Sequence, residues 1–133
     1  MKKRYLFVAF MILCVCTSGL ANEEAGVQNV LKDIPYDQEF MGKRKLVDED
    51  YLFMMQVALK PGQSVPQHDA NSNVHLLVLS GEVVIDLAGK TVNAVKGDLV
   101  PVANKTPMKI KNQSEADATF LVIKTPHPKK ISK

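Results

Sequence analysis

From Lys45 onward, the sequence is a succession of short apolar or alternating runs separated by turn residues. Pairs such as Pro61-Gly62 and Ser80-Gly81 mark the breaks, and their glycines can take the positive φ that tight turns require. Runs of this length, recurring roughly every 8 to 12 positions, are typical of strands in an all-β sandwich or barrel. The pattern predicts strands at residues 43–47, 51–60, 65–68, 74–79, 82–87, 90–95, 99–102, 108–111 and 119–124.

The first 21 residues have the layout of a bacterial secretory signal peptide. Lys2, Lys3 and Arg4 precede an apolar run over residues 5–16, and small residues lead up to Ala21. The apolar run is shorter than the about 20 residues that a membrane span needs. We therefore expect cleavage after Ala21 and a periplasmic or secreted mature protein.

Removal of this leader changes the charge and the cysteine count of the protein. The leader holds three of the 17 basic residues, none of the 14 acidic residues and both cysteines, so the mature chain carries 14 charges of each sign. A neutral chain gives no electrostatic reason to expect a nucleic-acid or membrane partner. Without thiols, disulfides, thiol catalysis and cysteine-bound metals are excluded from the mature chain.

The chain has the size and composition of one globular domain, with 133 residues of which 46% are hydrophobic and 23% charged. We expect residues 43–124 to form the β-barrel. Residues 22–42 are expected to be an N-terminal arm or edge segment, either a short helix or an edge strand, which could cover or exchange across a sheet edge and so give a homodimer. Residues 125–133 are expected to be a basic surface tail, in which His127 is solvated.

Two parts of the sequence resemble the conserved motifs of the cupin superfamily. Residues 59–68 (LKPGQSVPQH), followed by 77–82 (LVLSGE), are similar to the first motif, and 97–101 (GDLVP), 106–108 (TPM) and Asn112 are similar to the second. The resemblance covers about residues 51–124. It implies a single-domain antiparallel jelly-roll β-barrel of the RmlC-like cupin type, whose mouth usually holds a divalent metal.

The chain departs from this family at the positions that usually bind the metal. The family uses two histidines separated by one residue, then a glutamate, and a third histidine in the second motif. Carried onto this sequence, the first position is His68, but the others fall on Ala70, Val74 and Met108. Hydrocarbon side chains donate nothing and a thioether is a soft ligand, so Fe, Mn or Zn would lack its usual site. We therefore expect no cofactor.

The sequence thus favours a non-catalytic accessory or binding module for an unknown small molecule. An apolar interior with a few polar groups at its mouth has the composition of a small-ligand pocket. The residues expected to bind the ligand are His68, Gln56, Asn73 and Met108. The neighbouring His75 is expected to face outward, because side chains alternate along a strand.

Two alternatives stay open. In one, His68, Met108 and Met54 bind copper or another divalent metal, because imidazole and thioether ligands together suit copper, particularly Cu(I). In the other, the protein is an enzyme acting on a sugar or an organic acid, through a rebuilt metal site or through His68 as a general base. A base needs an orienting partner, and Asp69 should point the opposite way from His68.

Overall fold

The computed structural model describes residues 26–131, so the predicted signal peptide at 1–21 lies outside the described residues. Residues 26–131 contain nine strands and one short helix. The elements are β1 Gly42–Asp48, β2 Phe53–Leu59, β3 Ser64–Asp69, β4 Val74–Ser80, β5 Glu82–Leu87, β6 Lys90–Val95, β7 Leu99–Val102, β8 Pro107–Lys111, β9 Ala118–Lys124 and α1 Pro128–Ile131. The strand ends lie within two residues of those predicted from the sequence.

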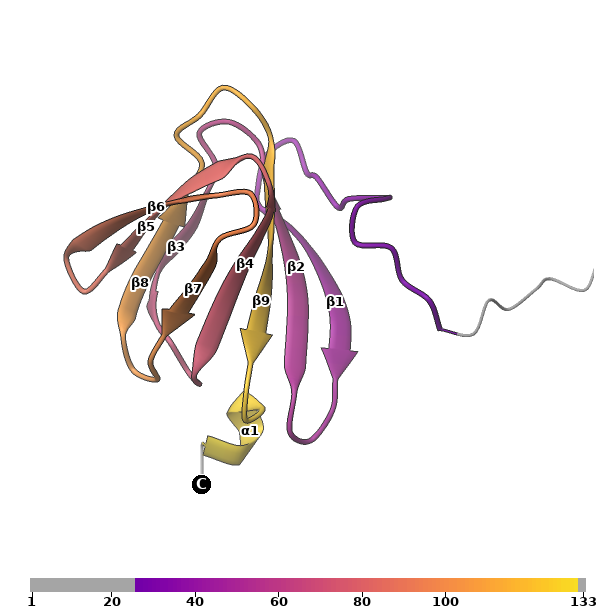
Figure 1. Cartoon of the computed structure of the whole chain (residues 1–133), viewed down its shortest axis with the longest axis vertical. Coiled ribbons are helices and arrows are strands. Elements are labelled where there is room, and N and C mark those ends of the chain that lie inside the picture. Colours follow the sequence, from indigo (N-terminus) through magenta and orange to yellow (C-terminus); the bar gives the residue numbers. More distant parts are fainter. Residues whose placement is uncertain (1–25, 132–133) are drawn as a thin grey trace, which may run out of the picture.

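The strands form two antiparallel sheets that face each other (Figure 1). One sheet has the order β1-β2-β9-β4-β7 and the other the order β3-β8-β5-β6. This arrangement confirms the predicted all-β jelly-roll fold. The sheets are not closed into a continuous hydrogen-bonded barrel, because no ladder among the described strands joins one sheet to the other.

The core lies between the sheets and follows the alternation of the strands. On β4, Val74, Leu76 and Val78 are all buried, while the residues between them are partly exposed. Phe120 of β9 and Ile85 of β5 are among the largest fully buried side chains. Burying an aliphatic or aromatic side chain of this size contributes roughly 1.5 to 3 kcal/mol, so this interior is the main source of the fold's stability.

A turn glycine and a buried asparagine hold the connections between strands. Gly81 has φ +69°, and a Cβ there would lie 2.4 Å from the carbonyl oxygen of Asp117. Asn112, which is fully buried, donates from its amide to the carbonyl oxygens of Leu59 and Ala116. Gly81 therefore has the turn role that the sequence predicts, and Asn112 ties the loop before β9 to the end of β2.

The arm, residues 26–41, forms neither of the expected elements. It packs as irregular chain against the β1–β2 part of its own sheet. The guanidinium of Arg44 donates to the carbonyl oxygens of Asn29, Lys32 and Asp33. The carbonyl oxygen of Pro35 comes so close to β1 that a Cβ at Gly42 would lie 1.4 Å from it. Through these contacts the arm packs against strands β1 and β2 of its own domain.

Candidate functional site

A small apolar cavity lies between the two sheets, and His68 and Met108 are the candidate residues that line it. It has a volume of about 60 Å³ and is lined by Met41, Met55, Val57, Val65, His68, Ala70, Val74, Met108, Ile110, Phe120, Val122 and Lys124. Pockets for organic ligands usually measure about 300 to 1,000 Å³. This cavity therefore has room for an ion or a few small molecules of water size.

The four positions that correspond to the family's metal ligands meet at this cavity. His68 of β3 lies directly opposite Met108 of β8 in the ladder between the two strands, so both side chains are on one face. Ala70 and Val74 line the same cavity and are 3% and 2% exposed. Ala70 and Val74 thus offer no donor atom. The other two positions supply one imidazole, from His68, and one thioether, from Met108.

The imidazole of His68 is held by its own strand. Its Nδ1 lies 2.8 Å from the carbonyl oxygen of Pro66, which can only accept a hydrogen bond. In the neutral ring the proton therefore sits on Nδ1, and the lone pair of Nε2 is left free. A free Nε2 lone pair can bind a metal or accept a proton.

Among the described residues that line the cavity, Lys124 is the only one with a formally charged side chain when His68 is neutral. Its ammonium donates to Asn71 Oδ1 at 2.8 Å and lies 5.8 Å from the centre of the Phe53 ring. Burial lowers the pKa of Lys124. Since the lining holds no carboxylate, no negative charge in it offsets the positive charge of a cation that enters the cavity.

Two of the predicted site residues lie elsewhere. Gln56 is fully buried, but under the arm, where its amide donates to the carbonyl oxygen of Val30 and to Thr119 Oγ1. Asn73 is exposed in the loop before β4, and its Oδ1 accepts from the backbone N–H of Asn104. The prediction that Gln56 and Asn73 lie at the cavity is wrong, because one faces the arm and the other holds a loop.

The structure also changes the methionine set. Met54 does not line the cavity, whereas its neighbour Met55 does, because successive side chains of β2 point to opposite faces. Met41, which precedes β1, is a second lining residue that the sequence reasoning missed. The alternation of β2 would have separated Met54 from Met55 if the inward face of that strand had been known.

Neither of the other two histidines reaches His68. His75 is partly exposed on β4 and lies between the inward-facing Val74 and Leu76. His127 is 6% exposed and packs at the end of the β1–β2 hairpin, so the prediction of a solvated His127 is wrong.

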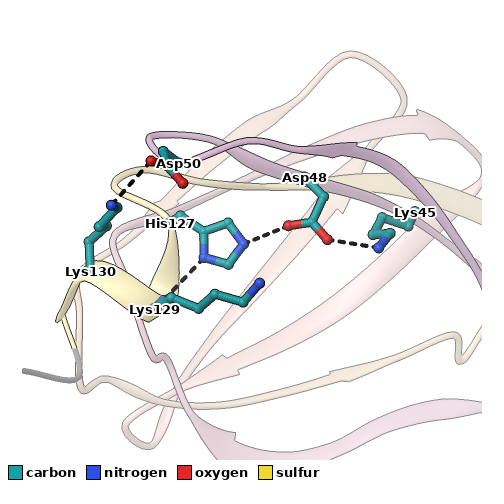
Figure 2. Close-up of polar contacts among 6 residues, drawn as sticks. All are labelled: Lys45, Asp48, Asp50, His127, Lys129 and Lys130. Atoms are coloured by element: carbon teal, nitrogen blue, oxygen red, sulfur yellow. Dashed lines mark hydrogen bonds and ion pairs between the residues drawn. The ribbon is translucent and has the colours of Figure 1, made fainter.

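Figure 2 shows the polar contacts around His127. The backbone N–H of Lys129 donates to Nδ1 at 3.1 Å, so Nε2 carries the ring proton and donates to Asp48 Oδ1 at 2.9 Å. Lys45 also pairs with Asp48, at 2.7 Å. Hydrogen bonds from Lys45 and His127 lower the pKa of Asp48. Because both ring nitrogens of His127 are engaged, this group fastens the tail and offers no free base.

The donor atoms at the cavity differ from those that a hard divalent metal prefers, since the lining holds one imidazole and no carboxylate. No group of three or more His, Cys, Asp or Glu side chains in residues 26–131 is placed to bind one ion. The residues at the cavity therefore do not fit the divalent metal that the fold usually holds. Within the same residues we also find no helix with the length and apolar character required to span a bilayer.

Comparison with known proteins supports the assignment of the fold. An uncharacterised protein of Methanocaldococcus jannaschii is 34% identical over 89 residues, which are 66% of this chain and 77% of that protein. A crystal structure from the same organism, described as an RmlC-like cupin family protein with a double-stranded β-helix fold, has a TM-score of 0.67 and 30% identity, covering 74% of this chain and 93% of that one.

A second solved structure, a protein of Thermus thermophilus, has a TM-score of 0.70 over 76% of this chain and 97% of that one, but only 22% identity. This likeness supports the fold alone. The model of the cupin domain family matches residues 55–124, which are more than half of the chain and include all of the four-stranded sheet and most of the five-stranded one. The chain therefore belongs to the cupin family.

Proposed function

We propose that this cupin is an exported, non-catalytic binding module whose cavity holds a small occupant at His68. The observation that carries the proposal is the cavity itself, which the exposed His68 lines while Ala70 and Val74 stand where the family has metal ligands. Such a cavity can hold an occupant by packing and by one directed bond.

The surroundings of His68 argue against catalysis by this residue. A catalytic histidine is usually oriented by a carboxylate, which stabilises the imidazolium that forms when it takes a proton. Here the orienting group is the carbonyl oxygen of Pro66, and Asp69 is exposed and absent from the cavity lining. The size of the cavity also disfavours a sugar or an organic acid as the occupant, since either would require the sheets to move apart.

Export is the second part of the proposal, and the charged, apolar and small-residue regions of residues 1–21 support it. Its test is N-terminal sequencing of the protein recovered from the periplasm or medium of the cells that make it. A mature chain that begins at Asn22 is the expected result. A cytosolic chain with Met1 or Lys2 at its N-terminus would contradict export.

Occupancy is tested by native mass spectrometry and elemental analysis of the mature protein purified from its own cells. The comparison uses Ala70→Leu, which fills the cavity, and His75→Ala, which leaves it unchanged. We expect the wild type and His75→Ala to carry a bound mass that Ala70→Leu lacks. The same bound mass in all three proteins, or no bound mass in any of them, would overturn the binding proposal.

A further inference from the structure

We propose that the occupant of this cavity is Cu(I), bound by Nε2 of His68 and by the thioether sulfurs of Met55 and Met108. This inference rests on the proposed binding function and names its ligand. The ligand set is not the one the family uses, and it became visible only when the structure placed Met55 at the cavity.

The methionines of the mature chain are concentrated at this cavity. Four of the six methionines follow the leader, and three of them, Met41, Met55 and Met108, line the cavity. Met108 lies opposite His68 in the β3–β8 ladder, and Met55 enters from β2 of the facing sheet. The cavity therefore receives thioethers from both of its walls, and Met41 adds a further sulfur to the lining.

His68 is arranged as metal-binding histidines usually are. Such a residue typically donates its second ring N–H to a backbone carbonyl or a carboxylate, which fixes the tautomer and the orientation of the ring. The Nδ1–H of His68 donates to the carbonyl oxygen of Pro66 at 2.8 Å. This hydrogen bond fixes the ring and leaves Nε2 available as a metal ligand.

The chemistry of the donors selects the ion. Thioether sulfur is a soft ligand that suits Cu(I), whereas Fe, Mn and Mg prefer the carboxylates and waters that this cavity lacks. The side-chain donor atoms in the lining are the ring nitrogens of His68, the three sulfurs and the ammonium nitrogen of Lys124. Of these, only the imidazole and the sulfurs are free to bind a soft cation, because the ammonium of Lys124 donates to Asn71.

The charge of the cavity favours a monovalent ion. The repulsion between Lys124 and a bound ion scales with the charge of that ion, and no carboxylate of the lining offsets it. Burial lowers the pKa of Lys124, so the charged form of this side chain is itself disfavoured here. A singly charged Cu(I) meets half of the repulsion that Zn(II) or Cu(II) would meet at the same place.

The test is an anaerobic titration of the mature protein with Cu(I) in the presence of a competing chelator. The ligand variants are Met55→Leu, Met108→Leu and His68→Asn, and the matched controls are Met54→Leu on the outer face of the same strand and His75→Asn. Methionine and leucine are close in volume, so the methionine variants should remain folded. Circular dichroism of each variant checks this.

We expect one equivalent of Cu(I) in the wild type and in both controls, and affinities weaker by about tenfold or more in each ligand variant. With methyl-labelled methionine, the NMR signals of Met55 and Met108 should shift on binding while that of Met54 stays in place. Equal Cu(I) affinity in the wild type, Met55→Leu and Met108→Leu would overturn the inference and leave the methionines as packing residues.

This experiment separates the two proposals. If the wild type binds no Cu(I) but carries another bound mass that Ala70→Leu lacks, the copper inference is overturned and the binding function stands. If Ala70→Leu matches the wild type both in bound mass and in Cu(I) binding, the cavity is not the site and both proposals are overturned.

Discussion

His127 donates from Nε2 to Oδ1 of Asp48 at 2.9 Å, which ties the C-terminal tail to a strand end 79 positions earlier in the chain. The ring also meets Phe53 edge to face, with the ring centres 5.5 Å apart. Figure 1 shows α1 at this end of the molecule, next to the β1–β2 hairpin. Residues 125–131 of the tail therefore pack as part of the folded domain.

The first prediction concerns the acid sensitivity of this contact. The pKa of Asp48 is lowered by hydrogen bonds from Lys45 and His127. Its contribution to stability is therefore present above the unfolded-state pKa of about 3.9 and is lost as the pH falls through the lower folded-state pKa. We expect Asp48→Asn to flatten the fall of the free energy of unfolding below about pH 4, measured by urea unfolding across a pH series.

Asp50→Asn is the matched control for Asp48→Asn. Asp50 pairs with Lys130 at 3.3 Å, but its side chain is 89% exposed, and such pairs contribute little. The control should follow the wild-type curve. If Asp48→Asn also follows that curve, the contact between His127 and Asp48 does not stabilise the fold.

The second prediction concerns Gln56, which joins the arm to the sheet from a fully buried position. Gln56→Leu leaves the carbonyl oxygen of Val30 without its amide donor, and Arg44 loses an acceptor. A buried polar group left unpaired costs about 1 to 3 kcal/mol, so we expect a loss of about 2 kcal/mol in the free energy of unfolding. Gln28→Leu, at an exposed hydrogen bond to Leu46, should change it by less than about 0.5 kcal/mol. Equal effects of the two variants would contradict the buried role of Gln56.

The third prediction concerns the close approach between Gly42 and the carbonyl oxygen of Pro35. A Cβ at Gly42 would lie 1.4 Å from this oxygen and 2.5 Å from its carbon, so the backbone of the arm must move. We expect Gly42→Ala to lower the free energy of unfolding by about 2 kcal/mol or more and to open the arm to limited proteolysis. Lys43→Ala, at the exposed next position, should leave both measurements unchanged. If the arm of Gly42→Ala resists proteolysis as the wild-type arm does, the close approach of Pro35 to Gly42 is contradicted.

Much of the fold could be predicted from the sequence, because its strands are short and their ends are marked. The turn at Ser80-Gly81 and the alternation around Val74 are local signals, and the local signals agree with the final structure. His68 and Met108 could also be assigned to one site from the sequence, because the motif resemblance aligned both with metal-binding positions. The β3–β8 ladder then shows that they lie opposite each other.

The remaining errors came from contacts between distant parts of the chain. The strand Phe53–Leu59 is apolar at nearly every position, so its pattern gives no sign of which face is inward, and Met54 and Gln56 were placed on the wrong side. The outer face of this strand is buried because the arm covers it, which the weak pattern of the arm does not reveal. The burial of His127 depends in the same way on the distant Asp48.

The central claim is that the residues at the family's metal-binding positions do not fit a hard divalent ion, because Ala70 and Val74 line the cavity without a donor atom in their side chains. Equilibrium dialysis of the metal-stripped mature protein against Mn(II) and Zn(II), beside a His68→Asn variant, tests it most directly. We predict equal and negligible retention of both ions by the two proteins at micromolar concentrations. One tightly held equivalent of either ion in the wild type, lost in His68→Asn, would contradict the account.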